Sequence, residues 1–102
     1  MREASLERKL LLAVKKAGGL CIKLPAAWYR GIPDRMILLP GGRIFFVELK
    51  VLKGRTTPHQ EKYIFILTKL GFKSDIIKGP TQLQEFIDAH IQDPIQSRDS
   101  ES

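Results

Sequence analysis

The segment 43–51, RIFFVELKV, holds two charged side chains in its otherwise apolar second half, Glu48 and Lys50. In an extended strand alternate side chains share a face, so Glu48 and Lys50 point the same way, about 6.5 Å apart. Charges in so apolar a strand are costly to bury unless they are paired or bind a cation. On this segment alone, a simple salt bridge or an exposed strand end is the favoured interpretation.

A second carboxylate, Asp34, changes that balance because it begins the preceding predicted strand, residues 34–39. The link Pro40-Gly41-Gly42 predicts a turn, so the two strands should form an antiparallel hairpin. Asp34, Glu48 and Lys50 each lie six to eight residues from the turn, which brings them together. Converging carboxylates repel each other unless a hard cation lies between them, and Mg²⁺ and Mn²⁺ suit such oxygen ligands. Aspartate beside proline is also a common turn residue, which is the alternative.

Glu7 is a third candidate carboxylate, in a helix predicted over residues 3–17. The helix follows from apolar residues that recur at spacings of four, three and four, namely Leu6, Leu10, Ala13 and Ala17. Glu7 lies at the edge of the apolar stripe that faces the sheet. Its carboxylate either caps the rim of the core or reaches toward the other acids, and taken alone it favours the rim.

The elements that must position these residues predict one α/β domain over residues 1–91. Thr57 fits a helix N-cap with Pro58 at the first helical position. Residues 43–51 should be buried on both faces, and Tyr63, Ile66, Leu67 and Leu70 should form the stripe of the second helix. Strands are expected at 20–24, 34–39, 43–51 and 72–77, and helices at 3–17, 58–70 and 81–90. A central mixed sheet of four strands, flanked by helices, is the simplest way to bury this order. Residues 92–102 are polar and predict a disordered tail.

Length and charge limit the classes of partner. The 102 residues suit one domain, and 17 basic against 11 acidic side chains leave a net charge of +6. Residues 1–90 alone carry +8, which suggests a polyanion and nucleic acid first, although a basic protein without such a partner is the alternative. No apolar run is long enough for a membrane span, and no secretory signal is visible. The single cysteine, Cys21, favours an intracellular location.

The ordered motifs resemble a known family of nucleases. Pro33-Asp34 followed by Glu48-Leu49-Lys50 resembles the PD…(D/E)xK pattern of restriction-endonuclease-like enzymes. More narrowly, residues 3–80 resemble the virus-type replication-repair nuclease (VRR-NUC) domain, in its stand-alone, bacteriophage form. That likeness rests on Glu7, Gly31-Ile32-Pro33-Asp34-Arg35, Val47-Glu48-Leu49-Lys50 and Pro58-His59-Gln60, in this order. It implies a restriction-endonuclease-like αβββαβ core with an added C-terminal helix.

The resemblance also implies roles for these residues. Asp34, Glu48 and the Leu49 backbone carbonyl would bind Mg²⁺ or Mn²⁺, and Glu7 would bind the metal directly or through water. Lys50 would hold the attacking water, help to deprotonate it and offset charge on the phosphate. Gln60 would orient Lys50, water or phosphate, although an exposed polar residue in a first helical turn explains it equally well.

Several residues beside the motifs are candidates for contacts with DNA. Trp28 offers a ring for stacking on an unpaired base or on a partner subunit, or it simply closes the core. The basic residues that flank the motif segments are Arg30, Arg35, Lys53 and Arg55.

The implied activity is a metal-dependent, structure-selective DNA endonuclease that hydrolyses phosphodiester bonds. Stand-alone relatives of this kind look like Holliday-junction resolvases that act as homodimers in DNA repair and recombination. The expected location is the cytoplasm of a bacterial or phage-infected cell. The alternatives are a flap- or nick-directed nuclease, a non-selective DNA nuclease, and, in another class, a non-catalytic DNA-binding module.

Overall fold

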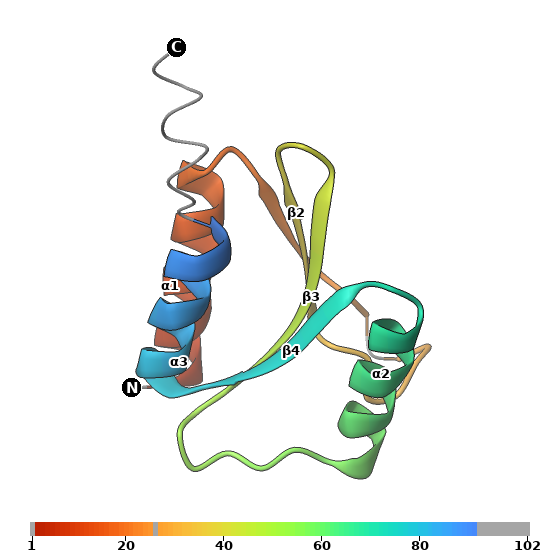
Figure 1. Cartoon of the computed structure of the whole chain (residues 1–102). Coiled ribbons are helices and arrows are strands. Elements are labelled where there is room, and N and C mark those ends of the chain that lie inside the picture. Colours follow the sequence, from red (N-terminus) through yellow and green to blue (C-terminus); the bar gives the residue numbers. More distant parts are fainter. Residues whose placement is uncertain (1, 26, 92–102) are drawn as a thin grey trace.

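A mixed four-stranded sheet forms the centre of the molecule (Figure 1). The computed structural model describes residues 2–25 and 27–91. The strands lie in the order β1 (Leu20–Lys23), β2 (Arg35–Leu39), β3 (Arg43–Lys50) and β4 (Lys73–Lys78). The first three pair in antiparallel fashion, and β4 pairs in parallel with β3. The predicted α/β class and mixed sheet are therefore confirmed.

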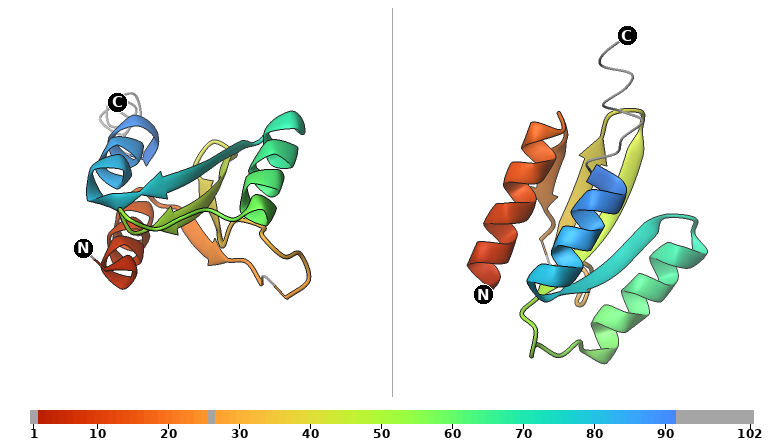
Figure 2. Two further views of the ribbon diagram at one scale, coloured as in Figure 1. Left: turned by 90° about the horizontal axis from the view of Figure 1, so that it is seen from below. Right: turned by 60° about the vertical axis from the view of Figure 1, so that its left-hand side comes forward.

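Helices cover the two faces of the sheet unequally (Figure 2). The helices α1 (Glu3–Lys16) and α3 (Gly79–Phe86) lie side by side on one face, and a π-helical segment, η1 (Ile87–Ile91), continues α3. The helix α2 (Pro58–Lys69) lies on the opposite face against β4. Below, these are the α1/α3 face and the α2 face. Each predicted helix and strand is present, with its ends within two residues of the expected ones when α3 and η1 are taken together as the last helix.

The core lies under the α1/α3 face. Helical spacing of the buried residues of α1 turns one stripe of Leu6, Leu10 and Val14 toward the sheet. Alternate residues of β3 point at this stripe, namely Phe45, Val47 and Leu49. The next residues along β3, including Glu48 and Lys50, therefore point to the α2 face. The core under the α1/α3 face therefore determines that Glu48 and Lys50 lie on the opposite face of the sheet.

Two packing predictions on the α2 face are wrong. The strand 43–51 is not buried on both faces throughout, because Ile44 and Phe46 are only half-buried where α2 does not cover β3. Leu70 is 67% exposed rather than part of the inward stripe. It forms the C-cap of α2, where the helix ends and Gly71 adopts a φ of 97°.

The predicted tail, residues 92–102, lies outside the described residues. Within residues 2–25 and 27–91, no helix is long and apolar enough to cross a bilayer.

Candidate active site

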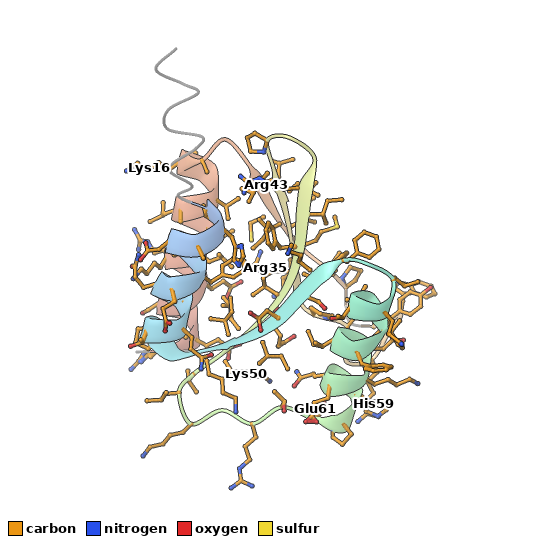
Figure 3. The ribbon with its side chains drawn as sticks, in the orientation of Figure 1. Lys16, Arg35, Arg43, Lys50, His59 and Glu61 are labelled. Carbon is orange, nitrogen blue, oxygen red and sulfur yellow. The ribbon has the colours of Figure 1, made fainter. Side chains whose placement is uncertain are left out.

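The hairpin β2–β3 brings Asp34, Glu48 and Lys50 to one end of the sheet. The register pairs Arg35 with Val47, so Asp34 lies across from Glu48. The backbone N–H of Asp34 donates to Oε1 of Glu48 at 3.2 Å, and Lys50 Nζ lies 3.9 Å from Oε2 of Glu48. Figure 3 shows Lys50 at this end of the sheet, beside the segment that leads to α2. The convergence expected from turn spacing is therefore present.

Burial raises the pKa values of both carboxyl groups, and a neighbouring carboxylate raises each further, Glu3 for Asp34 and Asp34 for Glu48. Glu48 is 7% exposed. Its pKa is raised to about 7, chiefly because the side chain is buried and secondly because of the charge of Asp34. Lys50 and the hydrogen bond from Asp34 offset only part of that rise. Burial is also the largest cause of the raised pKa of Asp34. Two ionised carboxylates at this place are costly without a further cation.

The donor set fits a hard divalent cation. Asp34 Oδ1 is buried and has no hydrogen-bond partner in the described part of the chain. A cation would satisfy that oxygen and relieve the repulsion between the two acids. No group of three or more His, Cys, Asp or Glu side chains gathers into a metal site within the described ranges. A cation held here would take two side-chain carboxylates, with backbone carbonyl oxygen and water as further ligands, a donor set that hard divalent cations accept.

Comparisons with known proteins identify the family. No protein-family model matches the chain. "Putative nuclease p44" of Acyrthosiphon pisum secondary endosymbiont phage 1 is 43% identical over 71 residues, which are 70% of this chain and 76% of that protein. A solved VRR_NUC domain superposes with a TM-score of 0.79 and 27% identity, over 86% of this chain and 96% of that one. The chain belongs to the VRR-NUC nuclease family.

A more distant structure shares the fold alone. Hjc of Archaeoglobus fulgidus, a Holliday junction resolvase, superposes with a TM-score of 0.52 and 20% identity. The superposition covers 72% of this chain and 64% of that one. The restriction-endonuclease-like order of elements predicted for this VRR-NUC domain is therefore shared with a resolvase.

Glu7 does not join the two acids directly. Its carboxylate forms an ion pair with the guanidinium of Arg35, which is 8% exposed. Arg35 follows Asp34 in the chain, and alternation turns its side chain to the α1/α3 face, away from Glu48. Arg35 was expected to contact DNA, but its side chain is buried and paired inside the domain. Glu7 thus reaches the start of β2 next to Asp34 rather than the acids themselves.

Sequence reasoning missed Glu3. The charge of Glu3 contributes to the raised pKa of Asp34 and, more weakly, of Glu48. Glu3 lies one helical turn before Glu7, so the two side chains project from the same side of α1. This i, i+4 spacing was the available signal. The first turn of α1 thus adds negative charge beside the carboxylate pair.

Gln60 takes part in the start of α2. The Gln60 backbone N–H donates to Oγ1 of Thr57 at 3.2 Å, and the Thr57 N–H donates to Oε1 of Gln60 at 3.0 Å. This reciprocal capping box, with Pro58 in the first turn, confirms the predicted helix start. The side-chain oxygen Oε1 of Gln60 is therefore used to cap α2. Its role toward Lys50, water or phosphate stays a prediction.

The loop before Asp34 is held against the start of α2. Gly31 adopts a φ of 91°, and a Cβ built there would lie 2.5 Å from the backbone carbonyl carbon of His59. Pro33 is buried, and the rings of Tyr29 and Tyr63 meet edge to face with centroids 6.4 Å apart. The contacts fix the backbone that leads into Asp34.

Replacing Gly31 with alanine should lower the free energy of unfolding by about 3 kcal/mol, because the new Cβ adds both a strained φ and a clash with His59. Chemical denaturation measures the loss. Gly41→Ala is the matched control, since Gly41 has a φ of 84° but no atom within 4 Å of the new Cβ. Its loss should be about 1 kcal/mol. Equal losses in the two variants would show that the close approach to His59 does not matter.

Proposed function

We propose that this VRR-NUC protein is a divalent-metal-dependent endonuclease that hydrolyses phosphodiester bonds in DNA. The observation that carries the proposal is the buried Glu48 beside the half-buried Asp34, with raised pKa values, an unpartnered Oδ1 of Asp34 and Lys50 next to Glu48. A structural salt bridge needs one acid for one lysine and gives no reason for a second carboxylate at the same place. Perturbed acids gathered beside a lysine are typical of an active site.

The proposed metal ligands are Asp34, Glu48 and the backbone carbonyl of Leu49, and the proposed ion is Mg²⁺ or Mn²⁺. A bound ion of this kind supplies a Lewis acid for the scissile phosphate and a lower pKa for a bound water. Lys50 holds the attacking water and offsets charge that develops on the phosphate. Glu7, paired with Arg35, acts on the site by holding the start of β2 or through water. Gln60 contributes through its side-chain Nε2 amino group, because its Oε1 accepts from Thr57.

The surface around the site suits DNA. Arg30, Lys53 and Arg55 are exposed, and the last two lie in the segment between β3 and α2. A net charge of +8 over residues 1–90 favours association with a polyanion. Arg35 is left out of this set because its guanidinium is buried against Glu7.

We further propose that the protein resolves four-way DNA junctions as a homodimer. It is supported by the fold shared with a Holliday junction resolvase. Two copies related by a two-fold axis would place two sites on a four-way junction, which needs two symmetric cuts. A flap- or nick-directed nuclease is the alternative within the same chemistry.

The function is tested with a labelled four-way junction, a flap and a linear duplex, each with Mg²⁺, Mn²⁺ or EDTA. We expect cleavage that requires the metal and favours branched DNA, with paired symmetric cuts in the junction. Light scattering of the same sample should give the mass of a dimer. Binding without cleavage of any substrate would instead identify a non-catalytic DNA-binding module. Equal cleavage of all three substrates would remove structure selectivity.

A further inference from the structure

Trp28 is the most exposed of the large hydrophobic side chains in the described residues, at 81%. It is also the single tryptophan of the chain. It therefore does not close the core, which was one of the expectations from sequence. An indole on the surface presents a large flat apolar face that another aromatic ring can cover by stacking.

The loop that carries Trp28, residues 27–33, is held against α2 by two contacts. Tyr29, the next residue, packs edge to face on Tyr63 of α2, and its carbonyl accepts the N–H of Ile32 at 3.1 Å. Gly31 lies against the backbone of His59. Trp28 is thus exposed on a loop whose following residues are fixed by packing, which lowers the entropy lost when Trp28 binds a partner.

The position of Trp28 relative to the site limits what it can touch. Trp28 lies six positions before Asp34, so even an extended chain would span no more than about 20 Å. On DNA that distance corresponds to about six nucleotides at roughly 3.4 Å per step along one strand. The indole therefore lies no farther from a phosphate bound at Asp34 and Glu48 than a nucleotide about six positions along the strand.

The charge around the loop favours the same partner. Residues 20–33 contain Lys23 and Arg30 but no acidic residue, and both basic side chains are exposed. Lys23 also lies beside the site, because it pairs with Arg35 in the β1–β2 register and the next N–H, of Leu24, donates to the carbonyl of Asp34 at 2.8 Å. An aromatic ring flanked by cations is the usual surface for a single-stranded segment, where bases stack on the ring and phosphates meet the charges.

We propose that Trp28 stacks on an unpaired base of the DNA close to the scissile phosphate. The proposal rests on the proposed nuclease function and names what selects the substrate. Bases inside an intact duplex are already stacked on both faces, so the indole gains a partner only where a base is unpaired. Base–aromatic stacking is worth about 1–3 kcal/mol, or roughly 5- to 100-fold in affinity. Trp28 thereby favours cleavage within about six nucleotides of such a base.

Two DNA duplexes that differ only in a short internal run of unpaired thymines test this directly. Binding is measured in EDTA, where no cleavage occurs, by the anisotropy of a dye on the DNA. Trp28→Ala should weaken binding of the duplex with unpaired thymines about 5- to 100-fold and change binding of the intact duplex less than about twofold. Trp28→Phe should restore most of the difference. In the wild-type protein, the DNA with unpaired thymines should quench tryptophan fluorescence more than the intact duplex does.

Phe65→Ala is the matched control, because Phe65 is another exposed aromatic residue, at 63%, on α2. It should bind both duplexes as the wild type does. Equal loss on both duplexes with Trp28→Ala, or no selective quenching, would overturn the stacking proposal. A change from dimer to monomer in light scattering of Trp28→Ala would also overturn it, by assigning Trp28 to an interface between copies.

The failure of this proposal and that of the proposed function are distinguishable. If the wild-type protein cleaves DNA with Mg²⁺ but Trp28→Ala retains the wild-type preference for unpaired sites, only the role of Trp28 is lost. If the wild-type protein neither binds nor cleaves any of the DNA substrates, the proposed function fails, and the role of Trp28 fails with it.

Discussion

Replacing Glu48 with glutamine should abolish metal-dependent cleavage and, at the same time, stabilise the protein in EDTA. The amide keeps the shape of the side chain but removes a charged ligand, and losing several kcal/mol of transition-state stabilisation lowers the rate at least about 10³-fold. In the metal-free protein, the same change removes the charge of the buried Glu48, which the half-buried Asp34 repels. Function and stability should therefore move in opposite directions.

The pH dependence follows from the raised pKa of Glu48. The folded protein holds this pKa at about 7, against an ordinary 4.5, so the contribution of Glu48 to stability without metal is fully present below pH 4.5. That stability falls as the pH rises through 7, because the unfolded chain ionises first. After allowance for solvent screening the loss is about 2 kcal/mol, and Glu48→Gln should escape it.

Thermal unfolding between pH 5 and about 8, with EDTA or with Mn²⁺, measures both effects. Mn²⁺ should raise the Tm of the wild type, since a ligand that binds only the folded state stabilises it, and should have little effect on Glu48→Gln. Glu85→Gln, on the exposed side of α3, should keep the cleavage and Tm of the wild type. A Glu48→Gln protein that cleaves DNA at the wild-type rate, or that is less stable than the wild type in EDTA at high pH, would contradict the metal-site assignment.

Replacing Lys50 with methionine should lower the cleavage rate at saturating DNA about 10²- to 10⁴-fold. Methionine keeps an unbranched apolar stem but cannot hold the attacking water or offset charge on the phosphate. Because Lys50 is not a metal ligand in the proposed site, Mn²⁺ should still raise the Tm of the variant. That combination, lost cleavage with retained metal binding, separates Lys50 from Glu48.

Lys16→Met is the matched control for Lys50. Figure 3 places Lys16 at the opposite end of the molecule from Lys50, near the C-terminal end of α1. The control loses the same formal charge and should cleave at the wild-type rate when DNA is saturating. Full activity of Lys50→Met, or the loss of its stabilisation by Mn²⁺, would remove Lys50 from its proposed role.

The residues of the hairpin could be placed from sequence because their arrangement depends on local geometry. The turn at Gly41-Gly42 sets the register of β2 and β3, and the period of two in a strand sets which side chains share a face. Those two rules are enough to bring Asp34, Glu48 and Lys50 together. The capping of α2 by Thr57 was predictable for the same reason, since a cap involves residues three apart.

The partners of side chains on different elements were decided by the tertiary structure. Glu7 was placed correctly on the inner edge of α1, but its pairing with Arg35 depends on how α1 lies across the sheet. The burial of Arg35, the exposure of Trp28 and the open part of the α2 face have the same origin. Periodicity determines the side on which a residue points within its own element. The residues that it meets there depend on how distant elements pack together, and the spacing of residues along the chain does not predict that packing.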